Sequence, residues 1–330
     1  MRANKATGRT GRVDMPQVHL HIGGYKTGST SIQAFLANRR GQMVRDAGLL
    51  YPKSLTHDDG GPGHVPLVQA LIAAARRGDN GQGGRLEKLM MALAVEVAQA
   101  EPQHIVVSSE VFLPALDLSR GLADPAILAR QELFADAQVI YYARPQWEAA
   151  LSKYKQVIKN PKIRYTGDFR SFVERWLPTV RYAEVLEPWR QAFSAERMVL
   201  RPYPGPAGRD FDAVADFLAT IGVEVAFASG AERENANISR GLYVTEQLRR
   251  YHEANPDISM HRRDVHPLLK QFEASASDAE KDAFEAEYKE RIRPILAEIR
   301  ERVADDNAKL IRAYALPADF FGPVAATVDG

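Results

Sequence analysis

The segment from Val18 to Leu36, VHLHIGGYKTGSTSIQAFL, constrains the fold more than any other part of the chain. Its first residues alternate apolar side chains with histidines, which is the period-two pattern of a β-strand. Gly23 and Gly24 allow a sharp turn. The hydroxyl residues 29–31, followed by apolar residues at helical spacing, predict a helix with a hydroxyl N-cap. Because free N–H groups and the helix dipole converge there, this order predicts an anion site.

Lys26 adds a positive charge to the same loop. In nucleoside-triphosphatase loops, G-x-x-x-x-G-K-[ST], the lysine follows the second glycine, whereas here it precedes Gly28. A magnesium nucleotide site also uses an aspartate at the end of a neighbouring strand. The two later strand candidates, HIVVSSE and QVIYYARP, contain none. The sequence therefore favours a nucleotide phosphate held without magnesium over a kinase-like site; the other alternative is a plain strand–turn–helix with a surface lysine.

The loop HIGGYKTGSTSIQ resembles the 5′-phosphosulfate loop of sulfotransferases that use 3′-phosphoadenosine-5′-phosphosulfate (PAPS), especially the bacterial carbohydrate-type members. Their loop has the form H-I-G-x-x-K-T-G-T-T-S-I-Q, and this chain carries Ser29 where threonine is usual. The resemblance implies that Lys26 stabilises charge on the leaving phosphate oxygen, without a metal. It also implies that the phosphosulfate is bound by Gly24, Lys26, Thr27, Gly28, Ser29 and Thr30.

A second motif follows the strand VIYYARP. Arg144 stands at the strand end, and Ser152 lies eight residues later on the predicted helix QWEAALSKYKQVIK. The pair resembles the PAPS motif that holds the 3′-phosphate, and an arginine fork with a hydroxyl suits that group. By the same resemblance, Tyr203 lies beside the adenine and Arg240 assists the 3′-phosphate. The chain lacks the K-G-x-x-G-D-W sequence of the cytosolic enzymes near Arg240.

Glu110 follows the predicted strand His104–Ser109. Ligands of open parallel sheets gather at the carboxyl ends of the strands, so Glu110 is expected near the Lys26 loop. In the glycan-modifying sulfotransferases the general base is usually a glutamate at this place, and the resemblance gives Glu110 that role. A general base needs a pKa raised by partial burial. The alternative is a structural carboxylate that caps a helix or pairs with a cleft lysine.

His64 has two readings. By resemblance, a histidine after the Tyr51-Pro52 step faces the acceptor side of the cleft and is the second candidate for the base; alternatively it only begins a helix. With His57, Asp58 and Asp59 it also forms a group of possible metal ligands. We favour a solvated glycine-rich loop there, because no ligand pair stands at helical spacing.

Lysines recur along the predicted helix after Arg144. Such a run usually forms a solvated helix face. It can also steer an anionic acceptor such as an acidic or sulfated sugar. The residues are Lys153, Lys155, Lys159, Lys162 and Arg164.

The composition limits the classes of protein to which the chain can belong. The chain has 330 residues, of which 45% are hydrophobic and 26% charged, so it can build an ordinary globular core. A formal net charge of +1 gives no case for nucleic-acid binding. The absence of cysteine excludes disulfides and thiolate chemistry and fits a reducing compartment. With no apolar leader and no run of about 18 apolar residues, we expect a cytoplasmic protein without a transmembrane segment.

The sequence thus predicts an α/β protein with a parallel sheet flanked by helices, the P-loop-like three-layer sulfotransferase fold, and a helical C-terminal extension. We expect a disordered tail over residues 1–15, the PAPS-binding domain over 16–240, and a helical lid or interface over 241–330. The expected activity is sulfuryl transfer from PAPS to a hydroxyl of a carbohydrate or glycoconjugate. The alternatives are a nucleotide or small-molecule kinase of related fold and a non-catalytic nucleotide-binding relative.

Overall fold

Five strands form one sheet in which every neighbouring pair is parallel, in the order β2-β3-β1-β4-β5. The computed structural model describes residues 15–24, 26–57, 61–78, 84–113, 123–204, 211–225 and 241–322. The strands are β1 (Gln17–His21), β2 (Leu49–Leu50), β3 (His104–Ser108), β4 (Gln138–Ala143) and β5 (Met198–Pro202). β1 lies at the centre of the sheet. β2 and β3, which come next in the chain, lie on one side of it, and β4 and β5 lie on the other. The carboxyl edge beside β1 is therefore the switch point at which such sheets bind ligands.

The helices described are α1 (Ser29–Asn38), α2 (Arg40–Ala47), α3 (Val65–Arg77), α4 (Arg85–Ala100), α5 (Pro125–Ala129), α6 (Gln146–Lys159), α7 (Phe169–Trp176), α8 (Tyr182–Phe193), α9 (Ala213–Thr220), α10 (Leu242–Ala254), α11 (Arg262–Ala274) and α12 (Asp278–Ala313). Short 3₁₀ turns are η1 (Glu110–Phe112), η3 (Glu132–Phe134), η4 (Leu177–Val180) and η5 (Ala195–Arg197). None of the described helices is both long enough and apolar enough to span a bilayer.

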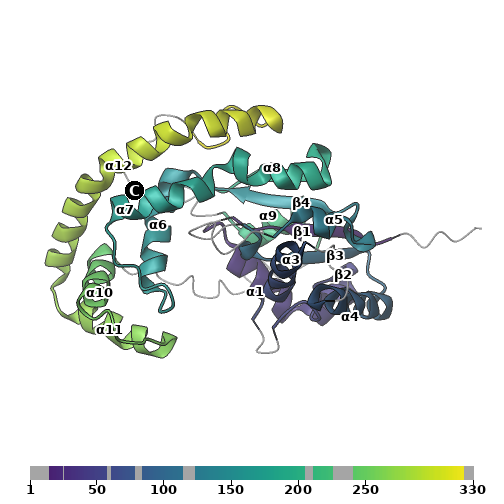
Figure 1. The fold of residues 1–330 in the computed structure, drawn as a ribbon, viewed down its shortest axis with the longest axis horizontal. Helices are drawn as coiled ribbons and strands as arrows, with labels where there is room; N and C mark the ends of the chain where they lie inside the picture. The colour runs from purple at the N-terminus through teal and green to yellow at the C-terminus, as the bar shows by residue number, and fades with distance from the viewer. Residues whose placement is uncertain are drawn as a thin grey trace, which may run out of the picture.

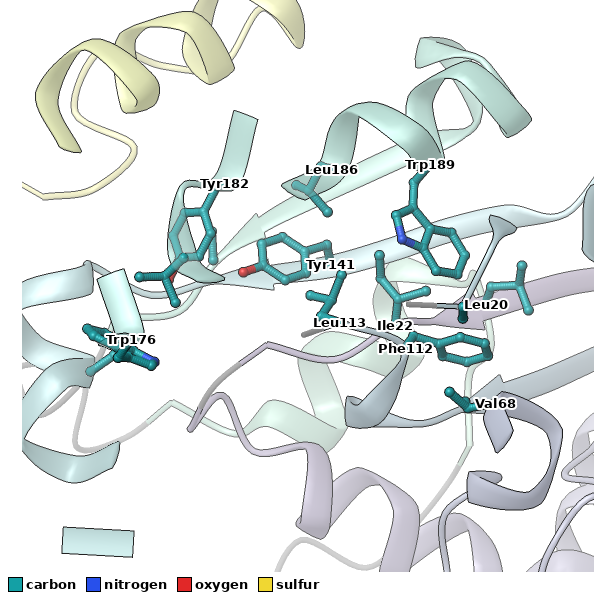
Figure 2. Packing of buried hydrophobic residues seen from close by; sticks show 14 of the residues in the cluster. Leu20, Ile22, Val68, Phe112, Leu113, Tyr141, Trp176, Tyr182, Leu186 and Trp189 are labelled. Carbon is teal, nitrogen blue, oxygen red and sulfur yellow. The ribbon is translucent and has the colours of Figure 1, made fainter. Parts of the chain in front are cut away.

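Each face of the sheet packs its own apolar cluster. Helices α1, α2 and α9 cover one face, where Ile32, Ile140 and Phe217 are buried together. The opposite face carries α3, α5 and α8, and Figure 2 shows Tyr141 and Trp189 among its large side chains. Alternate residues of each strand supply the two faces, which explains the period-two pattern of the sequence. The predicted α/β fold with a flanked parallel sheet is confirmed.

The predicted hydroxyl N-cap needed correction, and two helices contain an internal proline. α1 has no side-chain N-cap, because Gly28 precedes it in a left-handed conformation with φ 77° and Ser29 is already helical. Pro188 lies inside α8, and the buried residues around it hold that helix together despite the missing N–H. Pro294 likewise lies inside α12, which runs unbroken over 36 residues.

The C-terminal helices pack on the rest of the molecule rather than on one another alone. Figure 1 shows α12 arching over the ends of α6, α7 and α8, with α10 and α11 below it. Ile299 and Val303 are completely buried in the same apolar cluster as α8. The Asp306 carboxylate accepts hydrogen bonds from the backbone N–H groups of Ala183 (3.0 Å) and Glu184 (3.3 Å) at the start of α8. α12 therefore contributes to the main core.

Replacing Ile299 by alanine tests this contribution. Truncating a fully buried isoleucine costs about 2–5 kcal/mol of unfolding free energy. We expect Ile299→Ala to lower the denaturation midpoint of the whole chain, followed by the fluorescence of the tryptophans on α6, α7 and α8. The exposed Glu301→Ala is the matched control and should change stability by less than about 0.5 kcal/mol. An unchanged midpoint for Ile299→Ala would mean that α12 unfolds separately.

Candidate active site

The loop after β1 is held between the carboxyl ends of β3 and β4. A Cβ built on Gly23, whose φ is 80°, would lie 2.7 Å from the Cα of Glu110. On Gly24 it would lie 2.1 Å from the carbonyl oxygen of Tyr142. Real Cβ atoms do not approach so closely, so any larger residue would displace the loop. The two glycines thus allow the backbone of this loop to lie against both neighbouring strands.

Lys26 and Arg144 meet at this edge of the sheet. The Arg144 Nη1 group donates a hydrogen bond of 3.4 Å to the carbonyl oxygen of Lys26. Lys26 adopts a left-handed conformation with φ 60°, which is unusual for a residue with a side chain and occurs most often at functional sites. Its side chain reaches solvent, yet packing around the ammonium and then the charge of Arg144 lower its pKa. Two cations close together suit an anionic ligand.

The hydroxyl residues of the loop occupy different positions. Thr27 is buried, and its Oγ1 donates to the carbonyl oxygen of Gly24 at 3.0 Å. Ser29 is also buried, but its Oγ has no hydrogen-bond partner within the part of the chain that the structure describes. Thr30 is exposed on the first turn of α1. Because no side chain in the described residues caps α1, the backbone N–H groups of its first turn remain directed at the loop.

Glu110 begins η1, directly after β3. Its Oε2 accepts a hydrogen bond of 2.9 Å from the Nε2 group of Gln33, a buried residue of α1. The same Gln33 group lies 3.2 Å from Ser108 Oγ, which in turn is 2.8 Å from His21 Nδ1. We expected the Glu110 carboxylate to be partly buried, but its side chain is exposed. Gln33 holds one of its oxygens and leaves the carboxylate accessible from solvent.

His64 is completely buried beside the end of β3. Its Nδ1 accepts the backbone N–H of Ser108 at 2.9 Å, and its Nε2 lies 2.9 Å from the carbonyl oxygen of Pro52, to which it donates. Burial lowers its pKa to about 3, although the Pro52 carbonyl opposes that shift. Both nitrogens are thus bonded to the backbone. This geometry fits a structural role for His64. It leaves neither ring nitrogen free to take the proton of an acceptor hydroxyl.

Arg144 links β4 to α6 and is itself fixed by its neighbours. The Tyr182 hydroxyl donates to its carbonyl oxygen at 2.7 Å, and its Nε lies 3.7 Å from Glu148 Oε2. The guanidinium carbon stands 6.0 Å from the centroid of the Tyr203 ring. A Cβ on Gly28 would lie 3.7 Å from the same ring, so Tyr203 lies beside both the loop and Arg144. Ser152 is half-buried on α6, two turns further on.

Two lysines of α6 belong to the site rather than to a solvated face. Lys153 is buried, and desolvation followed by the charge of Lys26 lowers its pKa to about 8, while Glu110 opposes the shift. Burial also lowers the pKa of Lys155, a shift that Glu285 of α12 opposes and to which Lys26 and Lys289 add. α12 therefore brings both a carboxylate and an ammonium group near this edge.

The structure brings together most of the residues singled out in the sequence. The loop, Glu110, Arg144 and Tyr203 meet at one edge, whereas Arg240, Asp58 and Asp59 lie outside the described residues. No group of three potential His, Cys, Asp or Glu metal ligands occurs among the residues described. Sequence reasoning assigned no role to Gln33, although it closes the S-I-Q end of the loop motif. It also counted Lys153 among lysines that were expected to form a solvated helix face.

Comparisons with known proteins are sparse. No protein-family model matches the chain. An uncharacterized protein of Archaeoglobus fulgidus is 28% identical over 210 residues, which cover 64% of this chain and 53% of that protein. The chain thus spans about half the length of this relative. The crystal structure of the mouse sulfotransferase SULT7A1 complexed with PAP is similar over 87% of this chain and 89% of that chain, with 13% identity and a TM-score of 0.34. A score this low assigns no fold, so the functional argument rests on the site.

The buried histidines predict how stability depends on pH. Burial lowers the pKa of His64 to about 3, so between that pH and about 6.5 the unfolded chain binds a proton that the folded chain does not. Stability therefore rises with pH in this window and falls on acidification, by about 1.4 kcal/mol per pH unit for each such histidine. Burial lowers the pKa of His21 to about 3 and that of His19 to about 4, so both add to the slope.

Denaturant melts of His64→Gln between pH 4 and 8 measure this term. We expect the slope of stability below about pH 6 to be smaller than in the wild type by about 1.4 kcal/mol per unit. His266→Gln, which changes an exposed histidine, is the control for the substitution itself. A slope equal to the wild-type slope in His64→Gln would show that His64 titrates normally in the folded protein.

Proposed function

We propose that this protein is a PAPS-dependent sulfotransferase that transfers a sulfuryl group to a hydroxyl of an acceptor, and that the acceptor is a carbohydrate or glycoconjugate. The observation that carries the proposal is the contact between Arg144 and the Lys26 loop at the carboxyl edge of the sheet. PAPS has anionic groups at both ends of its ribose. The two motifs present one cation for each end, and the carbohydrate acceptor follows from the resemblance of the loop alone.

The residues at the site fit this cofactor. Gly24 and Gly28 leave no room for side chains, so backbone N–H groups can approach the 5′-phosphosulfate together with the uncapped first turn of α1. The buried Ser29 Oγ is a hydroxyl without a partner among the described residues. Arg144 and Ser152 would hold the 3′-phosphate, with Arg240 as a further candidate. The Tyr203 ring offers a flat apolar surface for the adenine.

The protein's own groups would act as follows. When bound, PAPS supplies an activated sulfuryl group, whose S–O bond to the 5′-phosphate breaks as the acceptor oxygen bonds to sulfur. Glu110, held by Gln33, takes the proton of the acceptor hydroxyl. Lys26 neutralises the negative charge that develops on the departing phosphate oxygen. His64 serves the fold in this scheme, because its nitrogens are bonded to Ser108 and Pro52.

Calorimetric titration with 3′-phosphoadenosine-5′-phosphate (PAP) in the absence of magnesium tests the proposed cofactor. We expect the wild type to bind and Arg144→Ala to lose about 2–3 kcal/mol of binding free energy, the size of a charge-assisted contact. Arg197→Ala is the matched control, since Arg197 pairs with Asp136 at the opposite end of the sheet. Absence of PAP binding, or magnesium-dependent binding of ATP instead, would refute the proposal in favour of a kinase-like activity.

Glu110→Gln separates proton transfer from cofactor binding. Labelled PAPS incubated with a panel of sugar hydroxyls identifies an acceptor for the wild type. With that acceptor we expect the variant to lose about 10²–10⁴ in turnover while PAP affinity stays within about twofold, because the amide keeps the shape but cannot accept a proton. Glu132→Gln changes an exposed glutamate away from the site and should behave as wild type. Wild-type turnover in Glu110→Gln would require another base.

A further inference from the structure

Gln33 is a buried amide that holds an exposed carboxylate. It lies on α1 with only 4% of its surface exposed, whereas the side chain of Glu110 is open to solvent. A glutamine amide carries two N–H donors. The Gln33 Nε2 group lies 2.9 Å from Glu110 Oε2 and 3.2 Å from Ser108 Oγ. Both donors are thus directed at acceptors near the carboxyl end of β3.

Hydrogen-bond accounting fixes the orientation of this amide. An ionised carboxylate can only accept, so the nitrogen and not the oxygen of the Gln33 side chain must face Glu110. The other N–H donates to Ser108 Oγ, and the Ser108 hydroxyl then donates to Nδ1 of His21, 2.8 Å away. Burial lowers the pKa of His21 to about 3, so this ring is neutral and its Nδ1 accepts. Each contact in the row therefore has one donor and one acceptor.

The packing around Gln33 keeps the amide from turning. A Cβ built on Gly63, just before α3, would lie 3.0 Å from Gln33 Oε1 and 3.4 Å from its Cδ, so this segment packs directly against the amide. Ser108 is completely buried, and its backbone N–H and carbonyl oxygen both bond to His64, each at 2.9 Å. The donor is therefore rigid, while the carboxylate that it holds belongs to an exposed side chain.

We propose that Gln33 is a positioning residue for Glu110. The proposal rests on the function proposed above and deepens it. An exposed glutamate side chain otherwise samples several rotamers. With Oε2 held by the Gln33 amide, Oε1 takes the proton of the acceptor hydroxyl, and the hydrogen bond favours the ionised carboxylate that a base requires. Gln33 thus holds the base in one orientation before the acceptor arrives.

Gln33→Met tests this role, because it removes the donor and keeps a side chain of similar length. With the sugar acceptor found for the wild type, we expect turnover to fall about tenfold while the KM for PAPS and the affinity for PAP stay within about twofold. Gln191→Met is the matched control. The Gln191 amide makes the same kind of bond, 2.9 Å to Glu187 Oε1, on an exposed part of α8, and this variant should match the wild type.

The pH dependence of turnover is a second readout. The hydrogen bond from Gln33 favours the ionised carboxylate, so the acidic limb of the turnover profile of Gln33→Met should move to higher pH by about one unit. Gln33→Glu should move the limb in the same direction, because two neighbouring carboxylates do not ionise together easily. A variant that is only less stable would not move the limb at pH values where it is folded.

Other titratable side chains belong to the elements that meet at this edge, and every variant retains them. They are Lys26 of the loop, His21 of β1, Tyr51 after β2, His64 before α3 and Lys153 of α6. Tyr51 and Lys153 couple electrostatically to Glu110. Because these groups are common to all the proteins compared, a shift confined to the Gln33 variants reports on Glu110.

A double variant separates positioning from a structural effect. In Glu110→Gln the base is already absent, so adding Gln33→Met should not lower turnover further. A tenfold loss that persists in this background would show that Gln33 acts independently of Glu110 and would overturn the inference. Ser108→Ala, which removes the second anchor of the amide, should lower turnover less than Gln33→Met does and gives the test if Gln33→Met does not fold.

The outcomes distinguish this inference from the proposed function. If the wild type transfers the sulfuryl group and Gln33→Met matches it in turnover and pH profile, only the inference fails. A loss of turnover in Gln33→Met that is matched by weaker PAP binding and a lower melting temperature would make Gln33 a structural residue and also overturn the inference. If the wild type binds no PAP and transfers no sulfuryl group, both proposals fail.

Discussion

The close approach of the first loop to its neighbouring strands is the constraint on which the site depends. Gly23 and Gly24 allow the backbone after β1 to lie against Glu110 on one side and the Tyr142 carbonyl on the other. This contact aligns the loop, the end of β3 and the end of β4 in a single edge. The cations and the carboxylate of the proposed chemistry come from this loop and from the ends of β3 and β4.

Charge is concentrated at this edge in a chain that is nearly neutral overall. The edge holds the loop lysine, the strand-end arginine and two lysines of α6, and both Glu285 and Lys289 of α12 act on Lys155. Desolvation lowers the pKa of Lys26, Lys153 and Lys155. Holding these ammonium groups at the edge therefore costs folding free energy. An anion bound at such an edge would favour the charged forms of these groups and so add to stability.

The sequence was sufficient for the sheet and for the loop because both follow from local patterns. Strand patterns located β1, β3 and β4, and the glycine, lysine and hydroxyl spacing of the loop predicted the anion site. What it missed depends on tertiary contacts. The hydrogen bond from Gln33 to Glu110 joins residues far apart in the chain. The burial of Lys153 likewise depends on how α6 packs in the folded protein. His64 was ambiguous for the same reason, since only the folded chain brings Ser108 and Pro52 to its ring.

The polar contacts of α12 have a consequence for how this fold can be divided. Gln146, two residues after Arg144, donates to Asn307 Oδ1 at 2.8 Å, and Asn307 donates back at 3.2 Å. The helix that follows Arg144 is therefore anchored to a segment more than 150 residues later. A minimal module grafted into another protein should carry α12 with it, because a cut after β5 or α9 would remove Asn307 from the Gln146 amide and leave that amide only its hydrogen bond to the Val180 carbonyl oxygen.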